Sequence, residues 1–457
     1  MNQVVVIDVV GLTPRLLEHM PRLRRVGETR ALGAVLPAVT CSAQATFLTG
    51  LVPRDHGIVG NGWYFRDLGE VFLWRQHNRL VQGEKVWDIA RRTNPSYKVA
   101  NVCWWYAMGA ETDLLVTPRP IYYADGRKAP DCYTRPKELH DRLTSRLGDF
   151  PLFHYWGPTA SIRSSQWIVA ASRQILAEDN PDLLLTYVPH LDYDLQRYGA
   201  SSAQAVKAAA ELDAVLGPLL DDATRAGATV IVLSEYGITD VSRPIDINRL
   251  LRREGLLEVY VQDGMEYLDP WASRAFAVAD HQVAQVYVQD PADVEKAADL
   301  LRGLSGVGEV LDAEGKERFG LDHERAGELV ALAERDAWFT YYYWLDDANA
   351  PDFARGVEIH RKPGYDPAEL FFDPADRFVK PRAASYLVKK KLGLRYAMSV
   401  VPVDPSIVRG SHGLLPASPE DGPVLLVSDP ALLEAGAAVA PTDVRDLILR
   451  AGGIPRG

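Results

Sequence analysis

An apolar run close to the N-terminus constrains the fold more than any other feature of the chain. Residues 3–10 consist almost entirely of β-branched side chains, and Asp8 is the single charged residue among them. A run this uniform is typical of a strand covered on both faces of a parallel sheet. The strand-then-helix order recurs, with predicted strands at residues 97–102, 182–188 and 228–233 and predicted helices at residues 14–23, 168–177 and 203–223. This alternation predicts an α/β fold built on a doubly wound, mostly parallel sheet.

The pattern changes after about residue 240. A small α+β unit is predicted there, with strands at 281–288 and 308–312, a helix at 291–304, and long loops over 336–375. An apolar strand at 424–428 and a helix at 442–451 then return to the earlier pattern. We therefore expect a discontinuous core of residues 1–244 and 400–457, with residues 245–399 inserted as a cap that governs substrate specificity.

Charge and cysteine content restrict the partners and the compartment. The formal net charge of -11 weighs against nucleic acid as the main partner, because a phosphate backbone attracts basic surfaces. The chain has three cysteines, Cys41, Cys103 and Cys132, and a small odd number does not form a disulfide framework. This cysteine content suits a reducing compartment. Neither a signal peptide nor a long apolar run is recognisable, so we expect a cytoplasmic protein without a membrane span. The oligomeric state is left open.

Four polar residues stand where predicted strands end or in a glycine-flanked turn: Asp8, Asp192, Glu235 and His412. In open α/β sheets, ligands gather at the carboxyl edge of the strands. Carboxylates and an imidazole that converge at this edge indicate a divalent metal site. Taken singly, each of these residues could equally be a helix cap or a turn residue.

Thr40 precedes a helical run that extends to Thr49. A hydroxyl at a helix N-terminus lies near free amide groups, which favour a developing alkoxide. A bound cation would make that hydroxyl a nucleophile. The structural alternative is that Thr40 is only an N-cap.

Several motifs in one order resemble a known family. Asp8 in the first strand, PAVT ending at Thr40, and PRDHGIVGN ending at Asn61 are similar to the nucleotide pyrophosphatase/phosphodiesterase (type I phosphodiesterase) family. This family belongs to the alkaline phosphatase superfamily and includes phosphonoacetate hydrolase. Residues 192–199, 234–237 and 410–413 resemble the Asp-x-x-x-His-x-Tyr-Gly, Ser-Asp-His-Gly and Gly-x-His-Gly stretches of that family.

The resemblance implies an activity and a set of roles. The chain would hydrolyse a small phosphorylated substrate, namely a phosphodiester, a nucleotide pyrophosphate or a phosphonate, through a phospho-threonine intermediate. Thr40 would be the nucleophile and would share one metal ion with Asp8, while Asp192 and His412 would bind a second. Asn61 would donate to a phosphoryl oxygen. By resemblance the two divalent ions would be zinc.

Aromatic residues directly after Asn61 offer a further binding prediction. Trp63 and Tyr64 could stack on a base or a ring of the substrate, although aromatic side chains more often pack in a core.

The chain departs from the family pattern at its metal positions. Gln196 stands where the family has histidine, and Glu235 and Tyr236 stand where it has Asp-His. The site could therefore be richer in oxygen and prefer manganese, magnesium or iron. Another histidine could substitute instead, and the candidates are His190, His281, His323 and His360. His190 is the first choice, because residues i and i+2 of an extended chain share a face.

Two further functions stay open at this point. Relatives of the fold also act on phosphomonoesters or sulfate esters. If the metal site is degenerate and binds only one metal ion, or none, the chain could be a non-catalytic binding protein on an enzyme scaffold.

Overall fold

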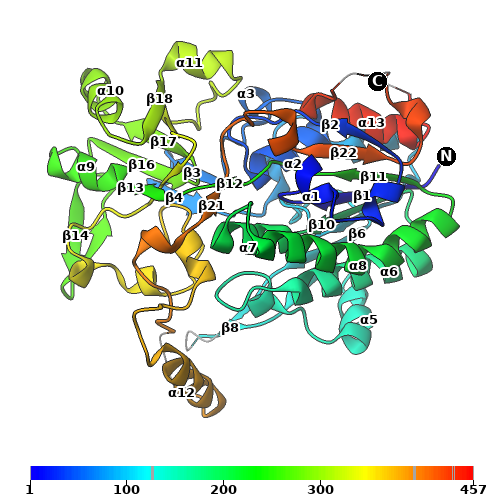
Figure 1. Cartoon of the computed structure of the whole chain (residues 1–457), viewed down its shortest axis with the longest axis horizontal. Coiled ribbons are helices and arrows are strands. Elements are labelled where there is room, and N and C mark those ends of the chain that lie inside the picture. Colours follow the sequence, from blue (N-terminus) through cyan, green and yellow to red (C-terminus); the bar gives the residue numbers. More distant parts are fainter. Residues whose placement is uncertain (1, 125–127, 395–397, 435, 437, 456–457) are drawn as a thin grey trace.

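The computed structural model describes residues 2–124, 128–394, 398–434, 436 and 438–455. An eight-stranded sheet forms the centre of its larger part (Figure 1). The strand order is β2 (Glu28–Ala31), β22 (Val424–Val427), β11 (Thr229–Leu233), β1 (Val4–Val9), β10 (Leu183–Val188), β5 (Val99–Val102), β6 (Leu114–Pro118) and β9 (Cys132–Arg135). The pairs from β11 through β1, β10 and β5 to β6 are parallel, whereas β22 and β9 run antiparallel to their neighbours.

Helices cover both faces of this sheet, which explains why every residue of β1 and β10 is buried (Figure 1). The helices on one face are α6 (Ile162–Asp179), α7 (His190–Tyr198) and α8 (Ala203–Arg225), and those on the other are α2 (Thr40–Thr49), α4 (Val86–Thr93) and α13 (Val444–Ala451). α5 (Glu138–Leu147) packs beside the edge strand β9. The predicted α/β fold with a mostly parallel sheet is confirmed.

A second, antiparallel sheet lies at the other end of the molecule (Figure 1). Its order is β16 (Ala275–Asp280), β17 (Val283–Val288), β19 (Leu329–Ala333) and β18 (Val307–Leu311). The surrounding helices are α9 (Ile247–Arg253), α10 (Val294–Arg302) and α11 (Ala313–Arg318), with a hairpin of β14 (Val259–Gln262) and β15 (Met265–Leu268). A hairpin from the first half of the chain, β3 (Gly62–Phe65) and β4 (Glu70–Leu73), packs against β16.

Short strand pairs connect the two sheets near the site. β12 (Thr239–Asp240) pairs with β21 (Gly410–Ser411), and β13 (Arg243–Ile245) pairs with β20 (Ala337–Phe339). The backbone N–H of Gln282 donates to the carbonyl of His412 at 2.8 Å. The turn between β16 and β17 is therefore held against the Gly410–Ser411 segment, close to the carboxyl end of β11.

One local expectation is wrong, and another holds with additional detail. The predicted helix over residues 14–23 is only α1 (Pro14–Leu17), because Pro21 has no N–H with which to continue it. Residues 336–375 are mostly irregular, as expected, apart from the strand β20 and short 3₁₀ turns, and Tyr341 to Trp344 are buried in the cap. The remaining elements are α3 (Pro53–His56), β7 (Ile121–Tyr122), β8 (Lys128–Ala129) and α12 (Val379–Lys391).

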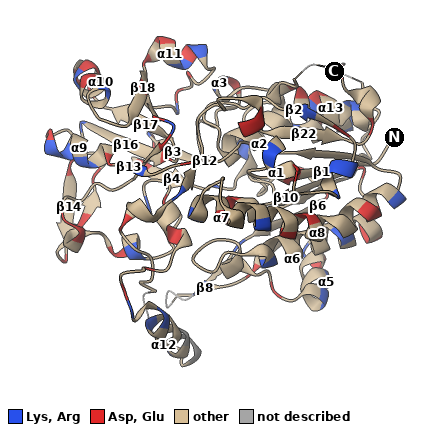
Figure 2. Cartoon of the chain, viewed as in Figure 1, with Lys and Arg blue, Asp and Glu red and all other residues tan. Residues whose placement is uncertain are grey.

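Acidic and basic residues are interspersed along the outer helices and loops, and neither sign forms one continuous face in the view of Figure 2. Among the described residues, no helix combines the length and the apolar character that crossing a membrane requires.

Candidate functional site

Three carboxylates meet at the carboxyl edge of the parallel strands. Asp8 lies near the end of β1, where its backbone is paired with Tyr187 of β10 and Leu233 of β11. Glu235 follows β11 by two residues, and Asp192 lies in the first turn of α7, which follows β10. The topology therefore places all three where ligands gather in open α/β sheets.

Thr40 is the first residue of α2, and the residue in the N-cap position is Val39. The Thr40 hydroxyl makes no capping hydrogen bond to the helix backbone; its oxygen lies 3.2 Å from the hydroxyl oxygen of Tyr236. The structural alternative of an N-cap is therefore wrong. Thr40 is a buried hydroxyl directed toward the carboxyl edge of the sheet.

The side-chain amide of Gln44, one helical turn after Thr40, lies between two of the carboxylates. Its Nε2 donates to Asp8 Oδ2 at 3.0 Å and to Glu235 Oε1 at 2.7 Å. The other oxygen of each carboxylate, Asp8 Oδ1 and Glu235 Oε2, is buried without a hydrogen-bond partner. Each of these two side chains thus keeps one free acceptor.

A second group surrounds Asp192. Gln196 Nε2 donates to Asp192 Oδ2 at 2.7 Å, and the Tyr365 hydroxyl donates to Gln196 Oε1 at 3.0 Å. The Asp192 Oδ1 atom has no hydrogen-bond partner and lies 3.9 Å from His412 Nε2. His412 Nδ1 lies 2.8 Å from the carbonyl of Ala38, which can only accept, so Nδ1 carries the proton of the neutral ring. The lone pair of His412 Nε2 is therefore available on the side of Asp192.

Four rings form a column beside these carboxylates. Tyr236 stacks on His412 with centroids 3.6 Å apart and planes 8° apart. His412 lies 3.7 Å from His281, and His281 lies 3.6 Å from Tyr365. The column joins the residues around Thr40 to those around Asp192.

The side chain and backbone of Asn61 are held by hydrogen bonds beside Thr40. Its Oδ1 accepts from the backbone N–H of Cys41, the residue after Thr40, at 3.1 Å. Its Nδ2 donates to Asp280 Oδ1 at 3.0 Å, and its backbone N–H donates to Asp280 Oδ2 at 2.7 Å. A side-chain amide carries two N–H donors, and the contact with Asp280 uses one of them. The other is available for a substrate oxygen.

Burial dominates the electrostatics of the site. It raises the pKa of Asp192 and of Glu235 to about 7 and that of Asp280 to about 6. Burial also raises the pKa of Asp8, and the neighbouring Glu235 raises it further. Among the described residues, no lysine or arginine forms a salt bridge with any of these four carboxylates. Buried carboxylates without a lysine or arginine partner fit a bound cation, because an unpaired buried charge is costly.

The predicted ligands thus fall into two sets. The set around Thr40 offers only oxygen, from Asp8, Thr40, Glu235 and Tyr236. The set around Asp192 offers a carboxylate oxygen and the imidazole of His412. The unpaired oxygens of Asp8, Glu235 and Asp192 are donors of the kind that divalent ions accept.

Other predicted residues lie elsewhere. His190 begins α7, where i and i+2 fall on different faces, so the expectation of an extended segment is wrong. Its Nε2 lies 3.4 Å from Glu211 Oε2 of α8. Trp63 and Tyr64 are buried in the apolar core of the cap, where Tyr64 packs edge-on against Phe276. Packing alone accounts for the position of both aromatic side chains.

Two of the cap histidines have contacts of their own. His323 Nδ1 accepts from the backbone N–H of Arg325 at 3.1 Å, and His360 Nδ1 lies 3.3 Å from the carbonyl of Leu73. His281 is the cap histidine that the structure brings into the site.

Sequence reasoning missed Gln44, Asp280 and Tyr365. Gln44 could have been found, because it is four residues after Thr40 and therefore shares its helix face. Asp280 and Tyr365 reach the site through the turn after β16 and through an irregular segment, neither of which has a local sequence signal.

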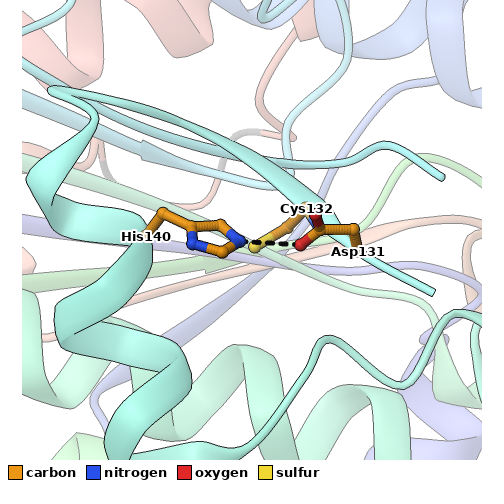
Figure 3. A group of neighbouring side chains, drawn as sticks. All are labelled: Asp131, Cys132 and His140. Atoms are coloured by element: carbon orange, nitrogen blue, oxygen red, sulfur yellow. Dashed lines mark hydrogen bonds and ion pairs between the residues drawn. The ribbon is translucent and has the colours of Figure 1, made fainter. Parts of the chain in front are cut away.

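One other group of potential metal ligands occurs among the described residues, at the edge strand β9 (Figure 3). The donor atoms of Asp131, Cys132 and His140 lie within 4.8 Å of one another. His140 Nε2 lies 2.8 Å from Asp131 Oδ1, and its Nδ1 lies 3.1 Å from Asp141 Oδ1. Burial raises the pKa of the Cys132 thiol to about 12, which keeps it protonated at neutral pH. Ion pairs of His140 account for this group.

Comparisons with known proteins agree with the fold. The phosphonoacetate hydrolase of Sinorhizobium meliloti, solved with phosphonoformate, superposes with a TM-score of 0.62 at 16% identity, over 99% of this chain and 96% of that one. Murine ectonucleotide pyrophosphatase/phosphodiesterase 5, in an inactive threonine-to-alanine form with AMP, gives a TM-score of 0.58 at 16% identity, over 100% and 96% of the two chains.

Sequence relatives point the same way. An uncharacterised pyrophosphatase/phosphodiesterase of Schizosaccharomyces pombe is 26% identical over 276 residues, which cover 58% of this chain and 47% of that protein. Human ectonucleotide pyrophosphatase/phosphodiesterase family member 1 is 20% identical over 232 residues, which cover 49% of this chain and 21% of that protein. The matched regions therefore span less than half of either relative.

The model of the type I phosphodiesterase/nucleotide pyrophosphatase family matches residues 4–366, from β1 of the core to the end of the segment that carries Tyr365. This match includes Thr40, Asn61, Asp192 and Glu235. The chain belongs to the type I phosphodiesterase/nucleotide pyrophosphatase family.

Proposed function

We propose that this chain is a metal-dependent hydrolase of a phosphodiester, a nucleotide pyrophosphate or a phosphonate, with Thr40 as its nucleophile. The observation that carries the proposal is the position of Thr40. Thr40 is the first residue of α2, and its hydroxyl lies near Glu235 and 3.2 Å from the hydroxyl oxygen of Tyr236. Glu235 and Asp8 share the amide of Gln44, and each keeps a free buried oxygen.

The side chains present fit two divalent ions. Asp8, Thr40, Glu235 and Tyr236 would hold one, and Asp192 and His412 would hold the other. When bound, the ions supply positive charge that activates the attacking oxygen and neutralises the leaving oxygen. The oxygen-only set around Thr40 favours manganese, magnesium or iron, whereas the histidine of the other set is compatible with zinc.

The residues of the chain then have distinct tasks. The Thr40 oxygen attacks phosphorus while its proton is released to water, a phosphorus–oxygen bond forms, and the bond to the leaving group breaks. The free amide groups at the N-terminus of α2 favour negative charge on that oxygen. The remaining N–H of Asn61 donates to a phosphoryl oxygen. Water then cleaves the phospho-threonine and restores the hydroxyl.

The solved relatives support this substrate class. They bind phosphonoformate and AMP, and the murine protein is described as inactive when a threonine is replaced by alanine. Both ligands are small and carry a phosphorus oxyanion, which is the chemistry that the proposed site would take.

The test is turnover of an aryl phosphodiester, an aryl phosphonate, an aryl phosphomonoester and an aryl sulfate, each with manganese, magnesium, iron or zinc. We expect a diester or phosphonate to be preferred and a chelator to abolish turnover. Thr40→Ala is expected to lower kcat by at least about 1,000-fold, while Thr40→Ser keeps measurable activity. Thr49→Ala on the same helix is the matched control and should retain the wild-type rate.

Three outcomes would contradict the proposal. These are full activity of Thr40→Ala, turnover that survives complete metal removal, and the absence of both metal binding and turnover. A clear preference for the monoester or the sulfate would move the substrate to another class on the same scaffold.

A further inference from the structure

His281 is buried at the turn between β16 and β17, and its Nε2 has no hydrogen-bond partner. The residue has a φ of 62°, in the left-handed region that side chains other than glycine rarely adopt. His281 and Gln282 form the two-residue turn of the β16–β17 hairpin, and such turns require a positive φ at their first residue. The orphaned nitrogen is therefore the feature that still needs an explanation.

Asp280 sets the state of the His281 ring. Its Oδ1 lies 2.8 Å from His281 Nδ1, and a carboxylate accepts from that nitrogen. With Nδ1 as the donor to Asp280, the Nε2 atom of the neutral ring carries a lone pair. A lone pair repels a phosphoryl oxygen and attracts a cation. A carboxylate behind a histidine is also the usual support of a metal-bound imidazole.

The neighbours of His281 are the residues of the second metal set. Its ring lies 3.7 Å from that of His412 and 3.6 Å from that of Tyr365, and Tyr365 donates to Gln196. Gln196 occupies the position where the family has a histidine, and its amide is already used by Asp192 and Tyr365. An imidazole is missing at 196, and an unassigned imidazole with a free nitrogen lies beside the same cluster.

We propose that His281, through Nε2, is the second imidazole ligand of the cation held by Asp192 and His412, and that Gln196 and Tyr365 position Asp192. The assignment rests on the metal site of the proposed function. It gives a set of two histidines and one carboxylate, which suits zinc or iron and leaves coordination positions open for substrate.

The donor atoms of Asp192, His281 and His412 are farther from one another than those of Asp131, Cys132 and His140 in Figure 3. Two ligands of one tetrahedral ion, each at about 2.0–2.1 Å, lie about 3.3 Å from each other. Asp192 Oδ1 and His412 Nε2, at 3.9 Å, are near this value. The stacked imidazoles must therefore tilt apart so that both Nε2 atoms turn toward the ion.

The test measures metal binding without reference to turnover. Wild type, His281→Asn and His190→Gln are titrated with zinc by calorimetry, and their bound metal is counted by mass spectrometry. Asparagine tolerates a positive φ but is too short to reach the ion. His190→Gln is the matched control, because His190 is also buried but faces Glu211.

We expect wild type and His190→Gln to bind two ions per chain. His281→Asn should keep one ion and bind the second more weakly. Loss of a residue that only hydrogen-bonds to a metal ligand weakens metal binding by about 10- to 100-fold, and the loss for His281→Asn should be larger than this. Binding of both ions by His281→Asn with wild-type affinity would overturn the proposal.

A zinc-soaked crystal of the wild-type chain tests the same claim if the variant does not fold. Anomalous density should place an ion about 2.1 Å from His281 Nε2. An ion on Asp192 and His412 with His281 outside its coordination sphere, or no ion there at saturating zinc, would overturn the assignment. Zinc bound through His281 in a protein inactive on every ester would support it while contradicting the proposed reaction.

Discussion

The hydroxyl oxygens of Thr40 and Tyr236 lie 3.2 Å apart in a region where both side chains are almost completely buried. Tyr236 stands where the family has a histidine, yet its ring stacks on His412 and its hydroxyl reaches the proposed nucleophile. A phenol in this position orients the threonine and adds one more oxygen to the donor set around Asp8 and Glu235.

Removal of the phenolic oxygen alone should impair catalysis without unfolding the protein. Tyr236→Phe keeps the stack on His412 and is expected to lower kcat by about 10- to 100-fold. Tyr236→His restores a nitrogen ligand and should bind zinc more tightly than wild type does. Steady-state kinetics and zinc titration measure the two effects. Wild-type kinetics for Tyr236→Phe with every metal would show that the contact has no role.

Gln44 should stabilise the metal-free protein. Its Nε2 donates to both Asp8 and Glu235, so Gln44→Leu is expected to lower the free energy of unfolding by about 1.5–3 kcal/mol. A saturating divalent ion should restore part of that loss, since a ligand at 100 times its Kd adds about 2.7 kcal/mol. Denaturant unfolding with and without metal measures both changes. The exposed helix substitution Gln204→Leu is the control, and an equal loss there would refute the assigned role.

The stability of the metal-free protein should fall as the pH rises from about 4 to about 7. Burial raises the pKa of Asp192 from 3.8 to about 7, so the folded chain binds more protons than the unfolded chain in this interval. The contribution of Asp192 to the free energy of unfolding is fully present below its ordinary pKa. It is lost as the pH rises through the raised pKa of the folded chain. Asp192→Asn should show a smaller fall in the free energy of unfolding, and a saturating divalent ion should reduce the fall in wild type. Identical pH profiles for the two proteins would contradict the assignment.

Lys362 should be a major contributor to the stability of the cap. Its ammonium is buried between Asp366 at 2.7 Å and Glu369 at 2.8 Å. Lys362→Met leaves two buried carboxylates without a cation and is expected to cost about 3–5 kcal/mol. Arg361→Met removes a neighbouring exposed ion pair and should cost about 0–1 kcal/mol. Thermal unfolding of both variants provides the comparison, and similar melting temperatures would argue against a special role for Lys362.

The core strands could be predicted from sequence because their composition leaves little choice. The strands β1, β10 and β11 are apolar at all but one position each, the exceptions being Asp8, Thr186 and Thr229, and a strand buried on both faces suits them. The aromatic run from Tyr341 to Trp344 has no such pattern. It is buried without forming a strand, because its surroundings in the cap, which the sequence does not reveal, decide its conformation.

The same distinction applies to the site. Asp8, Thr40 and Glu235 are positioned by the ends of regular elements, so strand and helix predictions bring them to one edge. Asp280, His281 and Tyr365 arrive from the cap through a turn and an irregular segment. Their approach depends on pairings between distant parts of the chain, such as β12 with β21, that local patterns do not encode.

In the proposed reaction, Thr40 carries the phosphorus group during turnover. The most direct measurement is rapid acid quench of the metal-loaded protein with a slow aryl phosphodiester, followed by mass spectrometry of its peptides. We expect a phosphorus adduct on the peptide that contains Thr40, which forms and decays at rates consistent with turnover and is absent in Thr40→Ala. An adduct on a different residue, or wild-type turnover by Thr40→Ala, would contradict it.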